Sequence, residues 1–264
     1  MLKKKLKELN LPNQTEEFAK LVDEAARSVS PIDQFASNAF DVEAAYEIQA
    51  SSIAMRLERG ERRTGIKMGF TSLAKMQQMG VHDLIWGRLT DQMMIAEGGE
   101  AASGRFIHPR VEPEIAFLLG DELAGSVTIP EAMSAVDAIA PAMEIIDSRY
   151  QDFKFSLADV VADNASSSGY VIGNWVFPNQ SFDNLGIVMS INGRPKQVGS
   201  TAAILGNPVR SLVHAARLAA GADEPLQPGW IVLAGAATAA EPIKPGDRIH
   251  AEFQNLGHVS FGIN

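Results

Sequence analysis

The chain has 264 residues, of which 46% are hydrophobic and 21% charged, an ordinary globular balance that suffices for one large domain. A net charge of −9, no long apolar run and no signal-peptide pattern predict a protein that contacts neither nucleic acid nor membrane. Cysteine is absent, which excludes disulfides and thiolate chemistry and fits a cytoplasmic location.

The first quarter of the chain has a helical pattern. We expect Asn13 to cap a first helix and Asp41 to cap a second one, which Gly60 ends. The pattern then changes to short strands. We therefore predict a helical N-terminal cap over residues 1–63 and a β-rich domain, which would carry the chemistry, over residues 64–264.

Two polar residues stand out in the first strands of the β-rich domain. Residues 64–72 are expected to form a strand that carries Lys67 and ends in a turn, and residues 73–79 a short helix. Asp91 lies in a further short extended segment. Taken alone, Lys67 is more often a solvated edge lysine and Asp91 a turn carboxylate, so neither residue indicates a site by itself.

Residues 108–119 are expected to form a strand that carries two glutamates on one face. Glu112 and Glu114 are two residues apart, and side chains alternate between the faces of a strand. Two neighbouring carboxylates repel each other and are costly to bury, and a divalent cation such as Mg²⁺ or Mn²⁺ resolves both problems. The alternative is a solvated polar face on an edge strand, which Pro113 would favour.

A third glutamate lies in another apolar strand. Residues 130–138 suggest a helix that starts with Pro130, and residues 139–150 suggest a strand that contains Glu144. A carboxylate in an apolar strand is costly unless something compensates it. If the two strands are neighbours joined by the helix, Glu112, Glu114 and Glu144 form a three-carboxylate site for a metal.

The rest of the chain continues in short elements. Residues 161–173 form a loop rich in small polar groups followed by a strand, and Asn192 with Gly193 indicates a hairpin turn. Asn207 caps a helix that ends at Gly221, and three short strands close the chain. Because strands outnumber helices, we predict an α+β protein with a largely antiparallel or mixed β core.

Four segments together resemble the hydratase/decarboxylase group of the fumarylacetoacetate hydrolase superfamily. They are GIKMGFTSLAKMQQMGV, HPRVEPEIAFLL, MEIIDSRYQDFKF and VVADNASSSGYVIG, in this order, and the resemblance covers the chain from about Asp41 to its end. It implies a mixed β-roll or barrel core with the helical cap, and a bound Mg²⁺ or Mn²⁺.

The resemblance also implies roles for individual residues. Glu112, Glu114 and Glu144 match the metal ligands of the family, and Lys67 and Asp91 match its catalytic residues. Three further positions are expected to contact substrate, and they are Ser166, Arg149 and Thr238. Arg149 has a structural ion pair as its alternative, and the segment around Thr238 lacks a glycine that the family pattern contains.

The family admits three functions for this chain. The two segments around Lys67 and Arg149 look most like its decarboxylases, which convert the dicarboxylic acid 4-oxalocrotonate to 2-hydroxypenta-2,4-dienoate and CO₂ in the meta-cleavage of aromatic compounds. The alternatives are hydration of 2-hydroxypenta-2,4-dienoate and a non-catalytic, metal-binding partner of a hydratase. The resemblance further implies a homo-oligomer, possible association with 2-oxopent-4-enoate hydratase, and a small 2-oxo acid as substrate.

Overall fold

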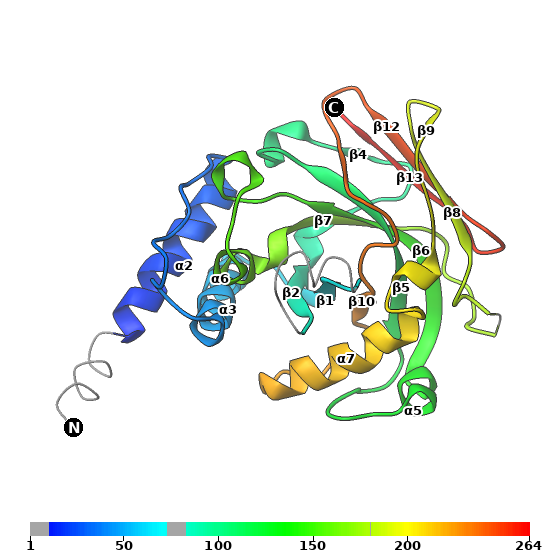
Figure 1. Cartoon of the computed structure of the whole chain (residues 1–264), viewed down its shortest axis with the longest axis horizontal. Helices are drawn as coiled ribbons and strands as arrows, with labels where there is room; N and C mark the ends of the chain where they lie inside the picture. The colour runs from blue at the N-terminus through cyan, green and yellow to red at the C-terminus, as the bar shows by residue number, and fades with distance from the viewer. Residues whose placement is uncertain (1–10, 73–82, 180) are drawn as a thin grey trace.

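Two β-sheets packed against each other form the body of the molecule, and helices flank them (Figure 1). The computed structural model describes residues 11–72, 83–179 and 181–264. The α+β class and the mixed β core are therefore confirmed, and the short helix expected over residues 73–79 lies outside the described residues. None of the described helices is long and apolar enough to cross a membrane.

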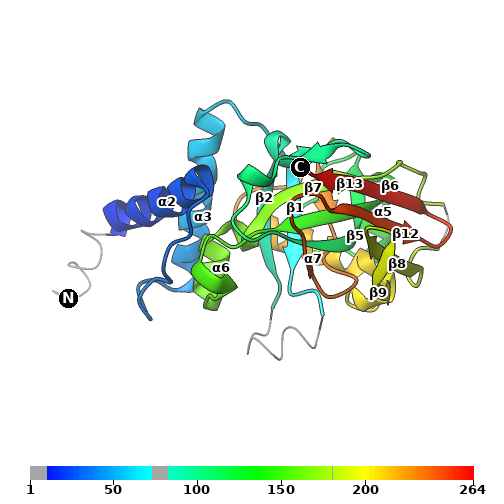
Figure 2. The same ribbon diagram turned by 90° about the horizontal axis from the view of Figure 1, so that it is seen from above.

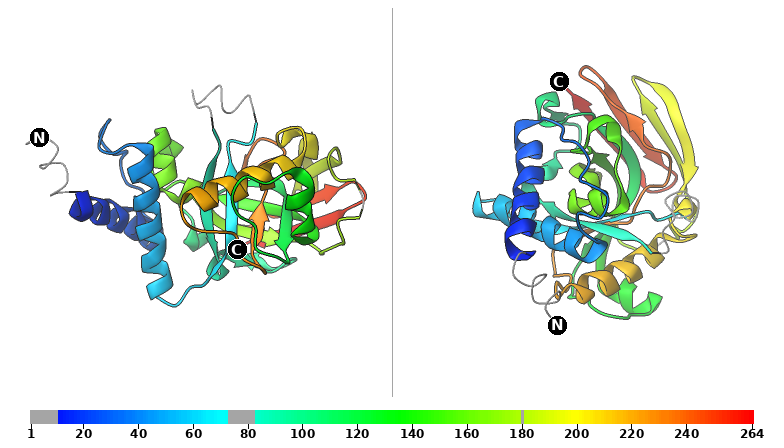
Figure 3. Two further views of the ribbon diagram at one scale, coloured as in Figure 1. Left: turned by 90° about the horizontal axis from the view of Figure 1, so that it is seen from below. Right: turned by 60° about the vertical axis from the view of Figure 1, so that its left-hand side comes forward.

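The two N-terminal helices pack together at one end of the sheets (Figure 3). They are α2 (Leu11–Ser28) and α3 (Val42–Glu58). Asp41 caps α3 as expected, accepting a hydrogen bond from the Ala44 N–H at 3.0 Å. The expectation for Asn13 was wrong, because α2 already includes Leu11 and Asn13 is its third residue. Proline is tolerated in the first helical turn, so Pro12 does not delay the helix.

Three further helices connect or cover the strands, and they are α5 (Ile129–Ser134), α6 (Leu157–Ala162) and α7 (Pro208–Gly221). Asn207 caps α7 as expected, accepting from the Val209 N–H at 2.9 Å. Helix α5 is shorter than predicted and begins one residue earlier, after the Thr128 cap. It cannot run on to residue 138, because Val136 already pairs with Leu119 in the sheet.

The larger sheet has eight strands in the order β2-β1-β10-β5-β6-β7-β3, with β11 paired to β5. Their bounds are β1 Arg63–Gly69, β2 Ile85–Thr90, β3 Met94–Ile95, β5 Arg110–Leu119, β6 Val136–Ile146, β7 Ser167–Ile172, β10 Ile231–Leu233 and β11 Glu241–Pro242. The pairs β1–β10 and β3–β7 are parallel and the other pairs are antiparallel. Strand β1 starts at Arg63, where the helical pattern of the sequence ends, but the division into two domains stays a prediction.

The smaller sheet has five strands in the order β4-β13-β12-β8-β9. Their bounds are β4 Glu100–Ala101, β8 Gly186–Ile191, β9 Arg194–Ser200, β12 Arg248–Phe253 and β13 Gly257–Ile263. Asn192 and Gly193 form the β8–β9 turn, both with positive φ, as the sequence predicted.

The main core is made of side chains from both sheets, whose strands Figure 2 shows from above. Val111, Ile115 and Phe117 of β5 belong to the same buried cluster as the inward side chains of β8, β12 and β13. Because side chains alternate along β5, Glu112 and Glu114 are directed to the opposite face of the larger sheet. The fold thus uses one face of β5 and β6 for the core and leaves the other face for the acidic residues.

Candidate metal centre

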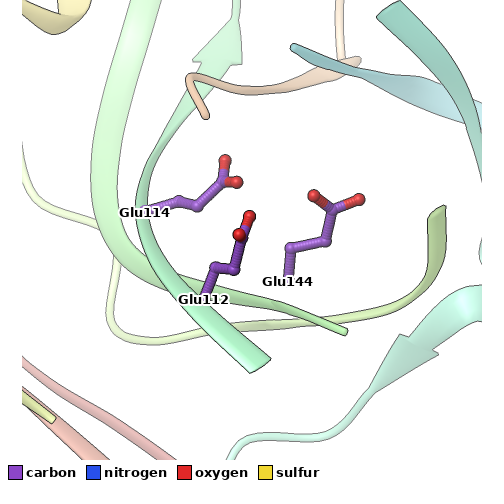
Figure 4. A group of neighbouring side chains, drawn as sticks. All are labelled: Glu112, Glu114 and Glu144. Atoms are coloured by element: carbon purple, nitrogen blue, oxygen red, sulfur yellow. The ribbon is translucent and has the colours of Figure 1, made fainter. Parts of the chain in front are cut away.

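Strands β5 and β6 place the three glutamates together (Figure 4). Glu112 lies directly opposite Glu144 in the antiparallel register, and Glu114 follows two residues along β5 on the same face. Each of the three offers a carboxylate oxygen that lies within 4.8 Å of those offered by the other two. The structure therefore brings together the three acids that the sequence singled out as metal ligands.

The acidic group is buried, which excludes the alternative of a solvated edge strand. Glu112 is 6% exposed, and Glu114 and Glu144 are 0% exposed. Strand β5 is paired with β6 on one side and with β10 and β11 on the other. Pro113 lies in the gap between the segments paired to β10 and β11, where its missing N–H costs no hydrogen bond.

Lys67 is the one basic side chain that contacts this acidic group among the described residues. It enters from β1, and its Nζ lies 2.9 Å from Oε2 of Glu144. The same Nζ donates to the carbonyl oxygen of Ala165 at 2.9 Å. The alternative of a solvated lysine is wrong, because Lys67 is only 4% exposed.

Burial and repulsion shift the pKa values of these groups. Burial raises the pKa of the Glu114 carboxyl well above its usual range, and repulsion from Glu144 adds to the shift. Burial also raises the pKa of Glu144, although Lys67 opposes this. Burial would lower the pKa of Lys67, but the attraction of the glutamates outweighs it, so that the pKa is raised and Lys67 stays charged. The ammonium group of Lys67 therefore pairs with Glu144, while the Glu114 carboxyl keeps a strongly raised pKa.

The donor set fits a hard divalent cation. Glu114 Oε2 accepts a hydrogen bond from the Gly235 N–H at 2.7 Å, but its buried Oε1 has no hydrogen-bond partner within the described part of the chain. A buried carboxylate oxygen without a partner is costly, and carboxylate oxygens are the ligands that Mg²⁺ and Mn²⁺ prefer. Glu112, Glu114 and Glu144 would hold such an ion, which would also offset their mutual repulsion.

A strained turn borders the centre next to Lys67. It is the 3₁₀ turn η4 (Asn164–Ser166), in which three successive residues have φ values of 50°, 51° and 58°. Ser166, expected to contact substrate, lies here with a buried hydroxyl that has no hydrogen-bond partner among the described residues. Sequence reasoning missed Asn164 and the Ala165 carbonyl, because a backbone oxygen leaves no signal in the side-chain pattern.

Arg149 is held by a buried acid. Its guanidinium pairs with the carboxylate of Asp163, donates to the Asp163 carbonyl oxygen at 2.6 Å, and also contacts the Ser168 hydroxyl. Burial raises the pKa of Asp163 to about 6, although Arg149 opposes this. The contacts of Arg149 thus agree with the structural ion pair that was its alternative, while its role toward substrate stays a prediction.

The hydrogen bonds and ion pairs that the structure shows for Asp91 and Thr238 go to residues other than the three glutamates. Asp91 is in the turn η1 (Asp91–Met93) rather than in a strand, where it pairs with the exposed Arg62 at 3.0 Å. Thr238 is on the loop after β10, and its hydroxyl donates to the Ala239 carbonyl at 3.1 Å. The loop itself runs beside β5, since the Ala237 N–H bonds the Pro113 carbonyl at 2.9 Å. The catalytic role of Asp91 and the substrate contact of Thr238 stay predictions.

A family model described as the C-terminal part of fumarylacetoacetate hydrolase matches residues 89–264. The chain belongs to the fumarylacetoacetate hydrolase family. It is also similar to a 4-oxalocrotonate decarboxylase from a Pseudomonas species, with 58% identity over 92% of this chain and 96% of that protein. A 2-keto-4-pentenoate hydratase from Paraburkholderia xenovorans is 35% identical over 94% of both chains.

The fold comparison agrees with this family assignment. The structure of a 4-oxalocrotonate decarboxylase from Pseudomonas putida G7, complexed with magnesium and adipate, matches with a TM-score of 0.93. The two chains are 35% identical, and the match covers 96% of this chain and 98% of that one. The expected fumarylacetoacetate-hydrolase-like fold with its helical N-terminal cap is therefore confirmed.

Proposed function

We propose that this family member catalyses the metal-dependent decarboxylation of 4-oxalocrotonate (2-oxo-3-hexenedioate) to 2-hydroxypenta-2,4-dienoate and CO₂. The observation that carries the proposal is the cluster of three buried carboxylates beside a buried, charged lysine. The 58% identity to a 4-oxalocrotonate decarboxylase favours decarboxylation over hydration, for which the identity is 35%. We assign the meta-cleavage of aromatic compounds as its pathway and the cytoplasm as its location.

The cation held by Glu112, Glu114 and Glu144 would supply Lewis-acid chemistry at the 2-oxo acid end of the substrate. Mg²⁺ is the proposed metal, with Mn²⁺ as a substitute, because both prefer oxygen ligands. Glu112, Glu114 and Glu144 would hold the ion, and the ion would then polarise oxygens of the substrate.

Decarboxylation requires a place for the electron pair of the bond that breaks. When the C5–C6 bond of 4-oxalocrotonate breaks, C6 leaves as CO₂ and the pair moves through C3=C4 to the oxygen on C2. Lys67 stabilises the negative charge that develops on this oxygen, and protonation of the oxygen gives 2-hydroxypenta-2,4-dienoate. The free hydroxyl of Ser166 is assigned to a polar group of the substrate.

Product analysis by NMR tests the proposal. The protein is incubated with Mg²⁺ and either 4-oxalocrotonate or 2-hydroxypenta-2,4-dienoate. The proposal expects loss of C6 as CO₂ from the first compound. Hydration of the second to a 4-hydroxy-2-oxo acid, with no CO₂ from the first, would make the protein a hydratase. No turnover of either would favour the non-catalytic metal-binding partner, against which the presence of Lys67 in the cluster speaks.

We also propose that the protein forms a homo-oligomer and associates with a 2-oxopent-4-enoate hydratase that consumes its product. The support is the family, whose members include hydratases similar to this chain along most of its length. Size-exclusion chromatography with light scattering, with and without the hydratase, tests both parts. A monomeric molar mass that does not change when the hydratase is added would contradict both parts.

A further inference from the structure

We propose that Asn164 is a positioning residue that sets the direction of the Lys67 ammonium group through the strained turn η4. The proposal rests on the function assigned above to Lys67. It concerns a side chain that bonds the backbone of Arg88 and thereby fixes an acceptor of Lys67.

The donors of Lys67 determine where its ammonium group can act. An ammonium group has three N–H donors. One is directed to the Ala165 carbonyl oxygen at 2.9 Å, and a second is within reach of Glu144 Oε2 at 2.9 Å. Within the described part of the chain, this hydrogen bond and this ion pair leave an N–H of Lys67 for the substrate oxygen. The direction of this third donor therefore depends on where the Ala165 carbonyl lies.

The turn that carries the Ala165 carbonyl has a strained conformation. Asn164, Ala165 and Ser166 all have positive φ, which L-residues rarely adopt and which costs free energy at each residue. A run of three such residues persists only if the surroundings hold it. The Ala165 carbonyl would move if the turn relaxed to an ordinary conformation.

The Asn164 side chain anchors the turn to strand β2. The Asn164 side chain accepts from the Arg88 N–H at 2.7 Å and donates to the Arg88 carbonyl at 2.9 Å. Arg88 is itself fixed, since its guanidinium bonds Gln49 at 2.6 Å and lies over the Trp86 ring. The amide of Asn164 thus ties the turn to a rigid strand by both of its polar ends.

The turn can approach β2 closely because residue 87 has no side chain. Gly87 lies directly opposite Lys67 in the β1–β2 register. A Cβ at Gly87 would come within 2.4 Å of the Asn164 carbonyl oxygen. Glycine at this position is therefore required for the turn to reach β2, and any larger residue displaces the Ala165 carbonyl from Lys67.

Two variants test the proposal. Asn164→Ala removes the anchor of the turn on β2, and Gly87→Ala adds a Cβ that pushes the turn away from β2. Each is expected to lower kcat about 10- to 100-fold with KM within about threefold, because the lost contact matters most when charge develops. The Kd for Mn²⁺, measured by calorimetry, should stay within about threefold, since the glutamates are on β5 and β6.

The control is Asn207→Ala, which removes the cap of α7 and should lower Tm while leaving kcat unchanged. A double-mutant cycle with Lys67→Met then tests whether Asn164 affects kcat through Lys67. If Asn164 acts through Lys67, Asn164→Ala costs nothing further in kcat in the Lys67→Met background. Multiplying effects, or a kcat unchanged in Asn164→Ala, would overturn the proposal.

The cycle also separates this inference from the proposed function. If the wild-type protein proves to be a hydratase, the decarboxylase assignment fails, but the same cycle is run on hydration of 2-hydroxypenta-2,4-dienoate. A coupling between Asn164 and Lys67 in that reaction keeps the positioning role. Its absence in whichever reaction the protein catalyses removes that role alone.

Discussion

Strands β12 and β5, one from each sheet, treat their acidic residues in opposite ways. In β12 of the smaller sheet, inward and outward residues alternate, and Glu252 lies on the exposed face. In β5 of the larger sheet nearly every residue is buried, and Glu112 and Glu114 are buried with the others. A carboxylate in water needs no partner, whereas a buried one does. Glu112 and Glu114 therefore need a partner that Glu252 does not need.

The largest effect should follow from removing one ligand of the buried cluster. Glu114→Gln leaves two carboxylates, and we expect Mn²⁺ affinity to fall at least about 100-fold and activity to be lost, while the fold persists. Isothermal calorimetry and a CO₂ assay measure this, and treatment with EDTA should abolish activity until Mg²⁺ is added.

The matched control for that variant is Glu252→Gln on the exposed face of β12. It should leave metal affinity unchanged and stability within about 0.5 kcal/mol. If both variants behaved alike, or if metal-free protein were fully active, the contrast between the two sheets would carry no functional meaning.

Replacing Arg149 should affect the free energy of unfolding more than activity. Arg149→Met would leave Asp163 buried without its partner, and we expect a loss of about 3–5 kcal/mol in the free energy of unfolding. Urea denaturation measures it. The exposed pair of Arg217 and Asp83 is the control, where Arg217→Met should cost less than about 1 kcal/mol. A stable Arg149→Met protein with a raised KM would instead make Arg149 a substrate contact.

Lys67 connects the acidic cluster to catalysis. Lys67→Met keeps the length of the side chain and removes its charge, and we expect kcat to fall about 10²–10³-fold with KM little changed. Steady-state kinetics with 4-oxalocrotonate measure both constants. A change confined to KM would show that Lys67 anchors a substrate carboxylate and does not stabilise the charge that develops.

The smallest effect concerns pH. Burial raises the pKa of Glu114 above its unfolded value, so the metal-free folded chain holds a proton that the unfolded chain releases. Stability of the metal-free protein should therefore be lost as pH rises through the raised pKa. Because the metal needs ionised carboxylates, saturating Mg²⁺ should raise Tm more at about pH 8 than at about pH 5.5. Bound Mg²⁺ stabilises the folded state by about 2.7 kcal/mol when its concentration is about 100 times Kd. An equal rise in Tm on adding Mg²⁺ at both pH values would contradict the raised pKa of Glu114.

The sequence predicted the acidic cluster well because its information is local. Glu112 and Glu114 share a face by strand alternation, and Glu144 stands out in an apolar strand. It could not predict the anchor of the turn, because the partners Asn164 and Arg88 are far apart in the chain and nothing in the local pattern joins them. Asp91 lies in a turn, as its alternative of a turn carboxylate predicted, but its pairing with Arg62 leaves no signal in the local pattern.

The order of the strands along the chain has a consequence for synthesis on the ribosome. Strands β5 and β6, with α5 between them, supply all three carboxylates from one short segment, which leaves the ribosome early. The Gly235 N–H that bonds Glu114 comes 121 residues later, and β10 must exist before β1 can pair with it. We therefore expect the acids of the nascent chain to contact water until β10 and Gly235, in about the last eighth of the chain, have been synthesised.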